Sequence, residues 1–328
     1  MRKRSTEILE QVVCHPSAST TIERFSTQYG VSERTIKNDL KEINSFLKSR
    51  QIAGRILTNH DGSLGLTGGI SPAAVLSSLK SLDTYSYRLS AEERRIYIVA
   101  SLLSADGYCT MQAIANELCV ARNTVVADIE VLDKEIAEYG AELALVPGKG
   151  MELSCSEGQR FELLFDLYRS VASNTEGEGF FQRLVLGKFS PRFSYSAIFE
   201  SVREFMDVNK LVLMDSDLYN VVLYIFVAVN FFGQDGRDEG LRTTPSEPSD
   251  AALVLYYVGY KLGASVSAET VARFRKYLER NGLSRFIKSV DQIDFCMAIS
   301  RFCRLLTPRD RIKYPKTVYS LKRFSPIL

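Results

Sequence analysis

The apolar positions between residues 33 and 47 repeat with the period of an α-helix. They are four, three and four residues apart and fall on one side of that helix: Ile36, Leu40, Ile43 and Leu47. A shorter apolar pattern precedes it, and only a small turn around Gly30 separates the two segments. This arrangement predicts a helix-turn-helix in which Ser32 caps the second helix.

The same pattern recurs 89 positions later in the chain. Thr20–Leu47 aligns without gaps on Cys109–Ile136, and Asp39 meets Asp128 in that alignment. The apolar positions of the later helix correspond to those of the earlier one: Val125, Ile129, Leu132 and Ile136. Apolar segments at Glu7–Val13 and Glu92–Leu103 would supply a further helix to each copy.

Each copy ends in a pattern of two short strands around a polar, glycine-containing turn. The two segments are Gly54–Leu66 and Ala141–Leu153. Helices followed by a β-hairpin form a winged helix-turn-helix, so the fold class we predict is mainly α, with two such domains in tandem before an all-helical bundle. The expected boundaries are residues 1–70 for the first domain, 71–89 for a linker, 90–157 for the second domain and 158–328 for the bundle.

Charge separates the two copies. The chain of 328 residues has a net charge of +2. Residues 1–69 carry ten lysines and arginines against seven acidic residues, whereas residues 90–157 carry five against twelve. Binding to a polyanion is therefore plausible for the first copy and unfavourable for the second.

In a helix-turn-helix the second helix is the recognition helix, which contacts the DNA bases. In the first copy this is the expected helix over residues 33–47, and the side opposite its apolar stripe has residue types suited to reading DNA. Arginine and lysine reach guanine acceptors or phosphates, and asparagine pairs with adenine. With the hairpin serving as a wing, the predicted DNA-binding residues are Ser32, Arg34, Thr35, Lys37, Asn38, Lys41, Arg55, Asn59 and His60. The competing interpretation is a solvated charged surface with pairs such as Glu33–Lys37.

The second copy is a weaker candidate for DNA binding. Its corresponding positions include Val126, Ala127 and Glu130, and Ala121 replaces the capping serine. A secondary, weak set of DNA contacts remains at Arg122, Asn123 and Thr124. Because phosphate contacts require cations, we favour a structural or dimer-forming role for this copy.

The segments "GVSERTIKNDLKEI", "CVARNTVVADIEVL" and "VPGKGMELSCSE" carry a family resemblance. Over residues 1–157 the chain resembles the paired N-terminal DNA-binding domains of bacterial sugar-operon regulators with phosphotransferase-regulation domains (the BglG and mannitol-operon activator type) and of the Mga-like virulence regulators. The resemblance implies a cytoplasmic regulator that binds double-stranded DNA as a homodimer and interacts with a phosphotransferase-system or other regulatory protein.

Residues 158–328 resemble a phosphotransferase-regulation domain in their helical pattern. A nearly all-apolar helix at Leu218–Phe232 would lie in its core, and a polar loop is expected at 237–250. The family's phosphorylated histidine opens a motif of the kind "HLxxxxxR", and the best match here puts Tyr224 at that degenerate position. The chain's two histidines, His15 and His60, lie outside this region, so histidine phosphorylation of the bundle is excluded.

Other chemistry finds little support in the sequence. His15 beside Cys14 lacks the further ligands of a zinc site, so we expect no metal and no cofactor. No glycine-rich nucleotide motif or Ser/His or Cys/His arrangement indicates an enzyme. No run of about 18 apolar residues predicts a membrane span, and the first residues lack the apolar core of a signal peptide, so a cytoplasmic location is expected.

Three functions therefore remain open. The favoured one is a sequence-specific transcription regulator that binds duplex DNA through the first copy. The alternatives are a tandem winged-helix replication initiator and a protein-interaction module that does not bind DNA.

Overall fold

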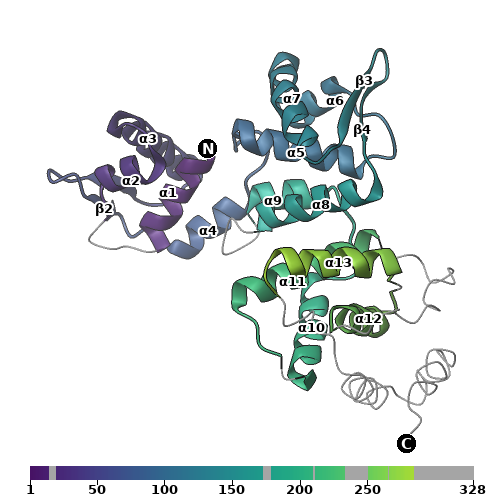
Figure 1. Cartoon of the computed structure of the whole chain (residues 1–328). Helices are drawn as coiled ribbons and strands as arrows, with labels where there is room; N and C mark the ends of the chain where they lie inside the picture. Colours follow the sequence, from purple (N-terminus) through teal and green to yellow (C-terminus); the bar gives the residue numbers. More distant parts are fainter. Residues whose placement is uncertain (15–19, 173–178, 210, 233–249, 265, 284–328) are drawn as a thin grey trace, which may run out of the picture. The chain divides into compact units, whose positions relative to one another are not determined.

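A computed structural model describes residues 1–14, 20–172, 179–209, 211–232, 250–264 and 266–283 (Figure 1). These residues contain thirteen helices and four short strands, which confirms the mainly α fold class. They divide into two compact units. The first comprises Met1–Leu163 and Ser170–Phe189, and the second combines Leu164–Arg169 with residues from Ser190 on. His15 and residues 237–249 of the expected polar loop lie outside the described residues.

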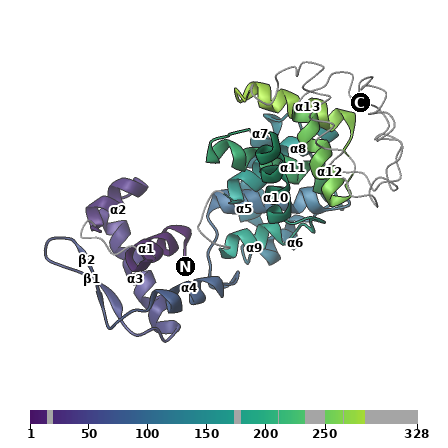
Figure 2. The same cartoon turned by 90° about the horizontal axis from the view of Figure 1, so that it is seen from below.

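The first copy consists of three helices and an antiparallel hairpin. Its elements are α1 (Lys3–Cys14), α2 (Ile22–Tyr29), α3 (Glu33–Ser49), β1 (Arg55–Thr58) and β2 (Leu64–Thr67). Figure 2 shows the hairpin beside these helices. The predicted apolar stripe of α3 is buried against α1 and α2, where Ile8, Phe25 and Ile43 are each 0% exposed. The helices form because this burial stabilises their amphipathic sequences.

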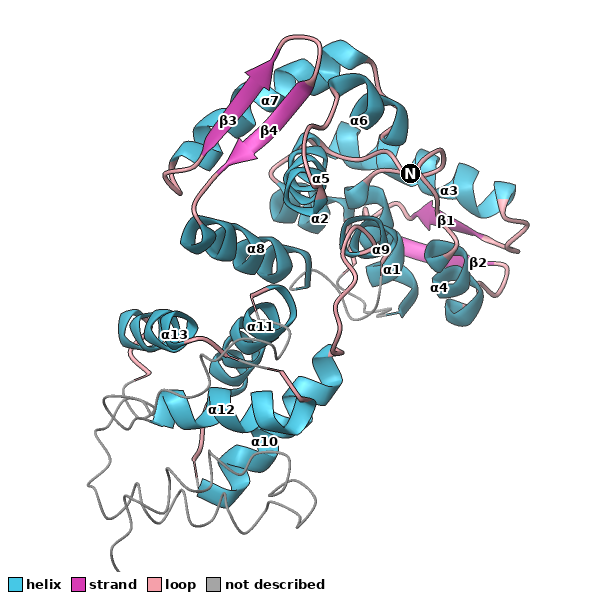
Figure 3. Ribbon diagram, turned by 90° about the vertical axis from the view of Figure 1, so that its right-hand side faces the viewer, coloured by secondary structure: helices cyan, strands magenta, loops and turns pink. Residues whose placement is uncertain are grey.

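The second copy repeats the same order of elements. It consists of α5 (Ala91–Ser104), α6 (Met111–Glu117), α7 (Arg122–Ala137), β3 (Glu142–Val146) and β4 (Gly150–Ser154). The antiparallel β3–β4 pair is drawn in magenta in Figure 3. Val125, Leu132 and Ile136 of the matched stripe are buried in its core. The helices and hairpins predicted for both copies are therefore confirmed.

Helix ends in the two copies follow their local sequence. Ser32 Oγ accepts a hydrogen bond from the Thr35 N–H at 3.3 Å, so the predicted cap of α3 is confirmed. Ala121 gives α7 no side-chain cap, as expected. Gly30 ends α2 with φ of 61°, a left-handed conformation that glycine adopts readily. The matching residue Cys119 has φ of 53° without that freedom.

Residues 71–89, expected as a linker, contain the helix α4 (Pro72–Lys80), whose Val75 and Leu79 are buried. After the second hairpin come α8 (Glu157–Ala172) and α9 (Phe180–Leu186). α9 belongs to the first unit, where the Phe180 ring packs 5.3 Å from that of Tyr87. Through this contact α9, which follows the second copy in the chain, packs against the segment 71–89 that connects the two copies.

The second unit is built around a buried apolar helix. Its helices are α10 (Tyr195–Asn209), α11 (Asp215–Phe231), α12 (Asp250–Leu262) and α13 (Ala268–Arg280), joined by the Leu164–Arg169 part of α8. Every residue of α11 from 221 to 229 is buried. The predicted central helix is thus confirmed.

Candidate nucleic-acid interface

The outward side of α3 presents a row of polar side chains. Arg34, Asn38 and Lys41 are exposed and lie four and three residues apart, so they share one side of the helix. Within the described part of the chain none of these three side chains has a hydrogen bond or ion pair. Their donors are therefore available to a ligand.

The remaining predicted residues of α3 already have partners in the protein. The hydroxyls of Ser32 and Thr35 lie 2.9 Å apart as part of the helix cap. Lys37 Nζ lies 3.6 Å from Glu33 Oε2, and both side chains are 56% exposed. An ion pair as exposed as this one contributes at most about 1 kcal/mol. Lys37 can therefore exchange its partner for a phosphate with little loss.

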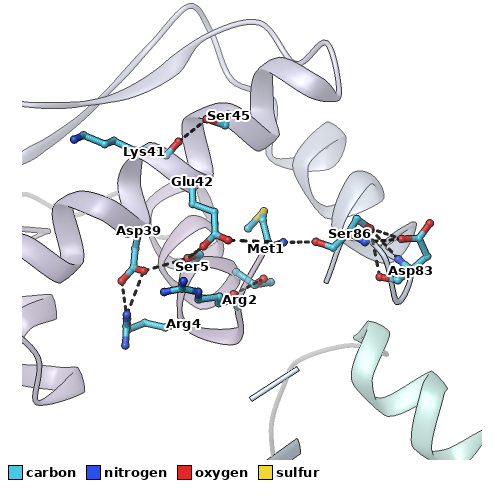
Figure 4. A network of polar contacts seen from close by, with 11 residues as sticks. Met1, Arg2, Arg4, Ser5, Asp39, Lys41, Glu42, Ser45, Asp83 and Ser86 are labelled. Atoms are coloured by element: carbon cyan, nitrogen blue, oxygen red, sulfur yellow. Dashed lines mark hydrogen bonds and ion pairs between the residues drawn. The ribbon is translucent and has the colours of Figure 1, made fainter. Parts of the chain in front are cut away.

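The inward side of α3 is held by ionic as well as apolar contacts (Figure 4). Arg4 of α1 binds Asp39 through two hydrogen bonds, of 2.6 Å from Nε and 3.2 Å from Nη2. Asp39 is 2% exposed. Ser5 Oγ donates to Glu42 Oε2 at 2.6 Å, and the Met1 ammonium donates to the Ser86 carbonyl. The contacts of Arg4 and Ser5 hold α3 by one side and leave its other side open.

The hairpin of the first copy adds exposed polar residues. Arg55 and His60 are exposed, at the base and in the turn respectively. Asn59 is exposed too, but its Nδ2 donates to Ser63 Oγ at 2.9 Å within the turn. Hydrogen bonds from the Ser63 hydroxyl and backbone N–H hold the pKa of Asp61 below its ordinary value. The turn therefore carries a negative charge near the predicted contacts.

Sequence reasoning missed Asn44, a half-buried residue of α3. Its Nδ2 donates to the Ile56 carbonyl at 2.9 Å, and its Oδ1 accepts from the Ile56 N–H at 2.8 Å. The carboxamide thus joins α3 to β1. No pattern in the sequence indicated this, because an asparagine beside an apolar stripe has no preferred partner.

The corresponding surface of the second copy has a different character. Arg122 and Asn123 are exposed and Thr124 is half-buried. The exposed residues that follow on the same side of α7 are Ala127 and Glu130, at the positions of Asn38 and Lys41 in α3. Val131 is 45% exposed. Between the start of α7 and the β3–β4 turn lies an open groove of about 360 Å³, bordered by Arg122, Lys149 and apolar residues including Leu145. This surface is less basic and more apolar than that of α3.

Tyr224, at the degenerate phosphorylation position, is 4% exposed. Its ring stacks 4.6 Å from that of Tyr277, and the rings of Phe274 and Phe165 lie 5.0 and 5.5 Å away. Aromatic contacts of this kind stabilise a core. The position is therefore structural in this chain.

Two other kinds of feature are absent from the residues that the structure describes. No three histidine, cysteine or acidic side chains gather there in a way that could hold a metal ion. Among the same residues no helix has the length and apolar character needed to cross a membrane.

Comparison with known proteins gives one informative similarity. No protein-family model matches the chain. It is 24% identical over 218 residues to a protein of Bacillus subtilis (strain 168) named "Probable licABCH operon regulator". The alignment covers 64% of this chain and 32% of that protein, so the chain spans about a third of the length of this relative.

Proposed function

We propose that the chain is a transcription regulator that binds double-stranded DNA in the cytoplasm through the outward side of α3. One observation carries the proposal: Arg34, Asn38 and Lys41 form an exposed row without partners among the described residues, while Asp39 and the apolar stripe anchor the opposite side. A recognition helix requires such a division, because one side must enter the major groove while the other remains packed. The similarity to an operon regulator supports the same function.

In this proposal each copy is a winged helix-turn-helix domain. The first makes the main DNA contacts, with α3 in the major groove and Arg55, Asn59 and His60 of the hairpin against the backbone or minor groove. Arg122, Asn123 and Thr124 of the second copy make weak contacts at most, because Glu130 replaces a cation on the outward side. The regulated genes belong to a sugar-uptake or virulence-type operon.

The direct test is DNA binding at two salt concentrations. The parent protein is titrated against fragments of its own genome at about 50 and 200 mM salt, and affinity should fall steeply between them. Arg34→Ala combined with Lys41→Ala should weaken binding at least tenfold. The salt slope should fall by about 1 for each phosphate that the variant no longer neutralises.

A matched control removes the same charge from the second copy. Lys134 and Lys149 are exposed cations of α7 and the β3–β4 turn, and replacing both by alanine should change affinity less than twofold. Equal binding by the parent and the Arg34/Lys41 variant would contradict the proposal. Absence of any DNA binding would favour a protein-interaction module, and selective binding to repeated origin sequences would favour a replication initiator.

We also propose that the regulator acts as a homodimer, with the second copy and the helical half available for protein contacts. The exposed Val131 and Leu145 of the second copy support a surface for protein rather than DNA. Tyr224 lies in the core of the helical half, so a regulatory protein would act on that half without phosphorylating this position. Light scattering at several concentrations should give twice the monomer mass; a monomer at all of them would refute the dimer.

A further inference from the structure

The hairpin of the first copy is fixed at its turn by α2 and the residues before it. The Ile22 N–H donates to the Gly62 carbonyl at 3.1 Å, and the Leu64 N–H donates to the Thr20 carbonyl at 2.8 Å. The second copy has an equivalent link, in which Cys109 and Met151 exchange two backbone hydrogen bonds of 2.8 Å. Both hairpins are therefore attached to their helices at the turn end of the second strand.

In the first copy a side chain of α3 also fixes the base of the hairpin. Asn44 satisfies both the N–H and the carbonyl of Ile56, at 2.8 and 2.9 Å. The residue that matches Asn44 after the 89-residue shift is Asp133. Asp133 is exposed, and within the described residues it forms no hydrogen bond to its hairpin. The two-bond contact therefore distinguishes the copy with the basic recognition helix from the copy without one.

The residue before Ile56 in β1 is a cation, Arg55. Ile56 is 3% exposed and points into the core. Successive side chains of a strand point to opposite sides, so Arg55 is directed outward. Asn44 lies three residues after Lys41 and seven after Lys37, on the same flank of α3. The hairpin is thus fixed to the helix beside its cations.

We infer that Asn44 is a positioning residue that sets the geometry between α3 and the hairpin, so that Arg55 and the recognition helix contact one DNA duplex together. This inference rests on the proposed function. Asn44 itself need not touch DNA, because its carboxamide is occupied by Ile56. Its effect passes through the backbone of β1 to Arg55.

A double-mutant cycle tests the inference. The probe is the DNA fragment that the parent binds most tightly. Its affinity is measured for the parent, for Arg55→Ala, for Asn44→Ala and for the double variant. Arg55→Ala should weaken binding by about fivefold and lower the salt slope by about 1 in the parent. In the Asn44→Ala background it should weaken binding by less than about 1.5-fold, because Arg55 is no longer held against the DNA.

A merely structural role for Asn44 would give a different result. Arg55→Ala would then weaken binding by the same factor in both backgrounds, and this outcome overturns the inference, as does an Arg55→Ala variant that binds like the parent. Asn44→Asp provides a second background, since it keeps the size of the side chain and reproduces the residue at position 133. Thermal unfolding confirms that each variant is folded at the assay temperature.

Two controls separate this inference from the proposed function. Ser45→Ala alters the next residue of α3, whose hydroxyl donates only to the Lys41 carbonyl in the described residues, and should leave the affinity unchanged. Loss of binding in the Arg34/Lys41 double variant together with additive effects of Asn44 and Arg55 would refute the positioning role alone. Unchanged binding in the Arg34/Lys41 variant would refute the proposed function as well.

Discussion

Arg94 of α5 binds Asp128 of α7 through two hydrogen bonds, of 2.6 Å from Nε and 3.0 Å from Nη2. The same contact between the first and third helices occurs in the first copy, where Arg4 of α1 binds Asp39 of α3. Both carboxylates are almost fully buried, at 5% and 2% exposure. Each copy therefore has a buried arginine–aspartate pair between its first and third helices, and the second copy adds a more exposed pair, Arg95–Glu135, with 3.0 Å between Nε and Oε1.

Removal of either carboxylate should destabilise its copy. Asp128→Ala leaves the mostly buried Arg94 guanidinium without its anionic partner, and a loss of about 2–4 kcal/mol in the free energy of unfolding is expected. Asp39→Ala should behave similarly. Thermal unfolding of the variants measures the loss.

A control for the Asp39→Ala prediction is the exposed ion pair on the same helix, α3. Glu33 and Lys37 are both 56% exposed, so Lys37→Ala should change the stability by less than about 1 kcal/mol. Equal effects of Lys37→Ala and Asp39→Ala would show that burial does not strengthen the inner pair.

The N-caps of α3 and α7 should respond to substitution in opposite directions. Ser32→Ala removes the acceptor for the Thr35 N–H and should destabilise the first copy by about 1 kcal/mol. Ala121→Ser, at a residue with extended backbone before α7, should stabilise the second copy by about 0.5–1 kcal/mol. Denaturant unfolding monitored by helical circular dichroism measures both; a destabilising Ala121→Ser would contradict the prediction.

The turns between the helices offer a second reciprocal pair. Gly30 has positive φ and open space where a Cβ would lie, so Gly30→Ala should cost about 1 kcal/mol through the backbone alone. Cys119 has the same left-handed conformation, so Cys119→Gly should be neutral to stabilising by about 1 kcal/mol, because relief of strain exceeds the added freedom of the unfolded chain. The melting temperature should fall for Gly30→Ala and should rise or stay unchanged for Cys119→Gly.

Glu117 should make a small acid-sensitive contribution to stability. Burial acts to raise its pKa, but hydrogen bonds from Lys188 at 2.8 Å and the Tyr97 hydroxyl at 2.6 Å outweigh it, and the pKa is lowered. A lowered carboxyl pKa stabilises the fold above the ordinary value of about 4.3 and loses that effect as the pH falls through the lowered pKa.

The variant Glu117→Gln tests this pH dependence. Its difference in melting temperature from the parent should be largest near neutral pH and should shrink below about pH 4.3. Because the Glu117 side chain is 47% exposed, the effect should stay below about 1 kcal/mol. A difference that grows with acidity would contradict the assignment.

Periodicity was sufficient to predict the repeated helices and hairpins. The apolar stripe of α3 and its copy in α7 are long and regular, and burial follows that pattern directly. The central helix α11 was equally visible, because an apolar surface on every side of a helix requires a core around it. The cap at Ser32 followed from the chemistry of a single residue next to the stripe.

The contacts that position the candidate site were not predicted. Asp39 and Asp128 align in the 89-residue repeat, but their partners Arg4 and Arg94 lie before the aligned segments and are 90 residues apart, so the alignment did not pair them. Asn44 binds a backbone group, which leaves no trace in the partner's side-chain identity. Both features depend on how helices and strands meet in three dimensions, which a linear pattern does not specify.

The shared ion pair has a consequence for how the two copies could diverge. The carboxylates of Arg4–Asp39 and Arg94–Asp128 are buried inside the two copies, whereas Lys41 and Glu130 are exposed and their side chains form no hydrogen bond or ion pair within the described residues. After a duplication, mutations could therefore accumulate on one exterior without unfolding either copy. Such a scaffold lets one copy keep its original ligand while the other copy acquires a different one.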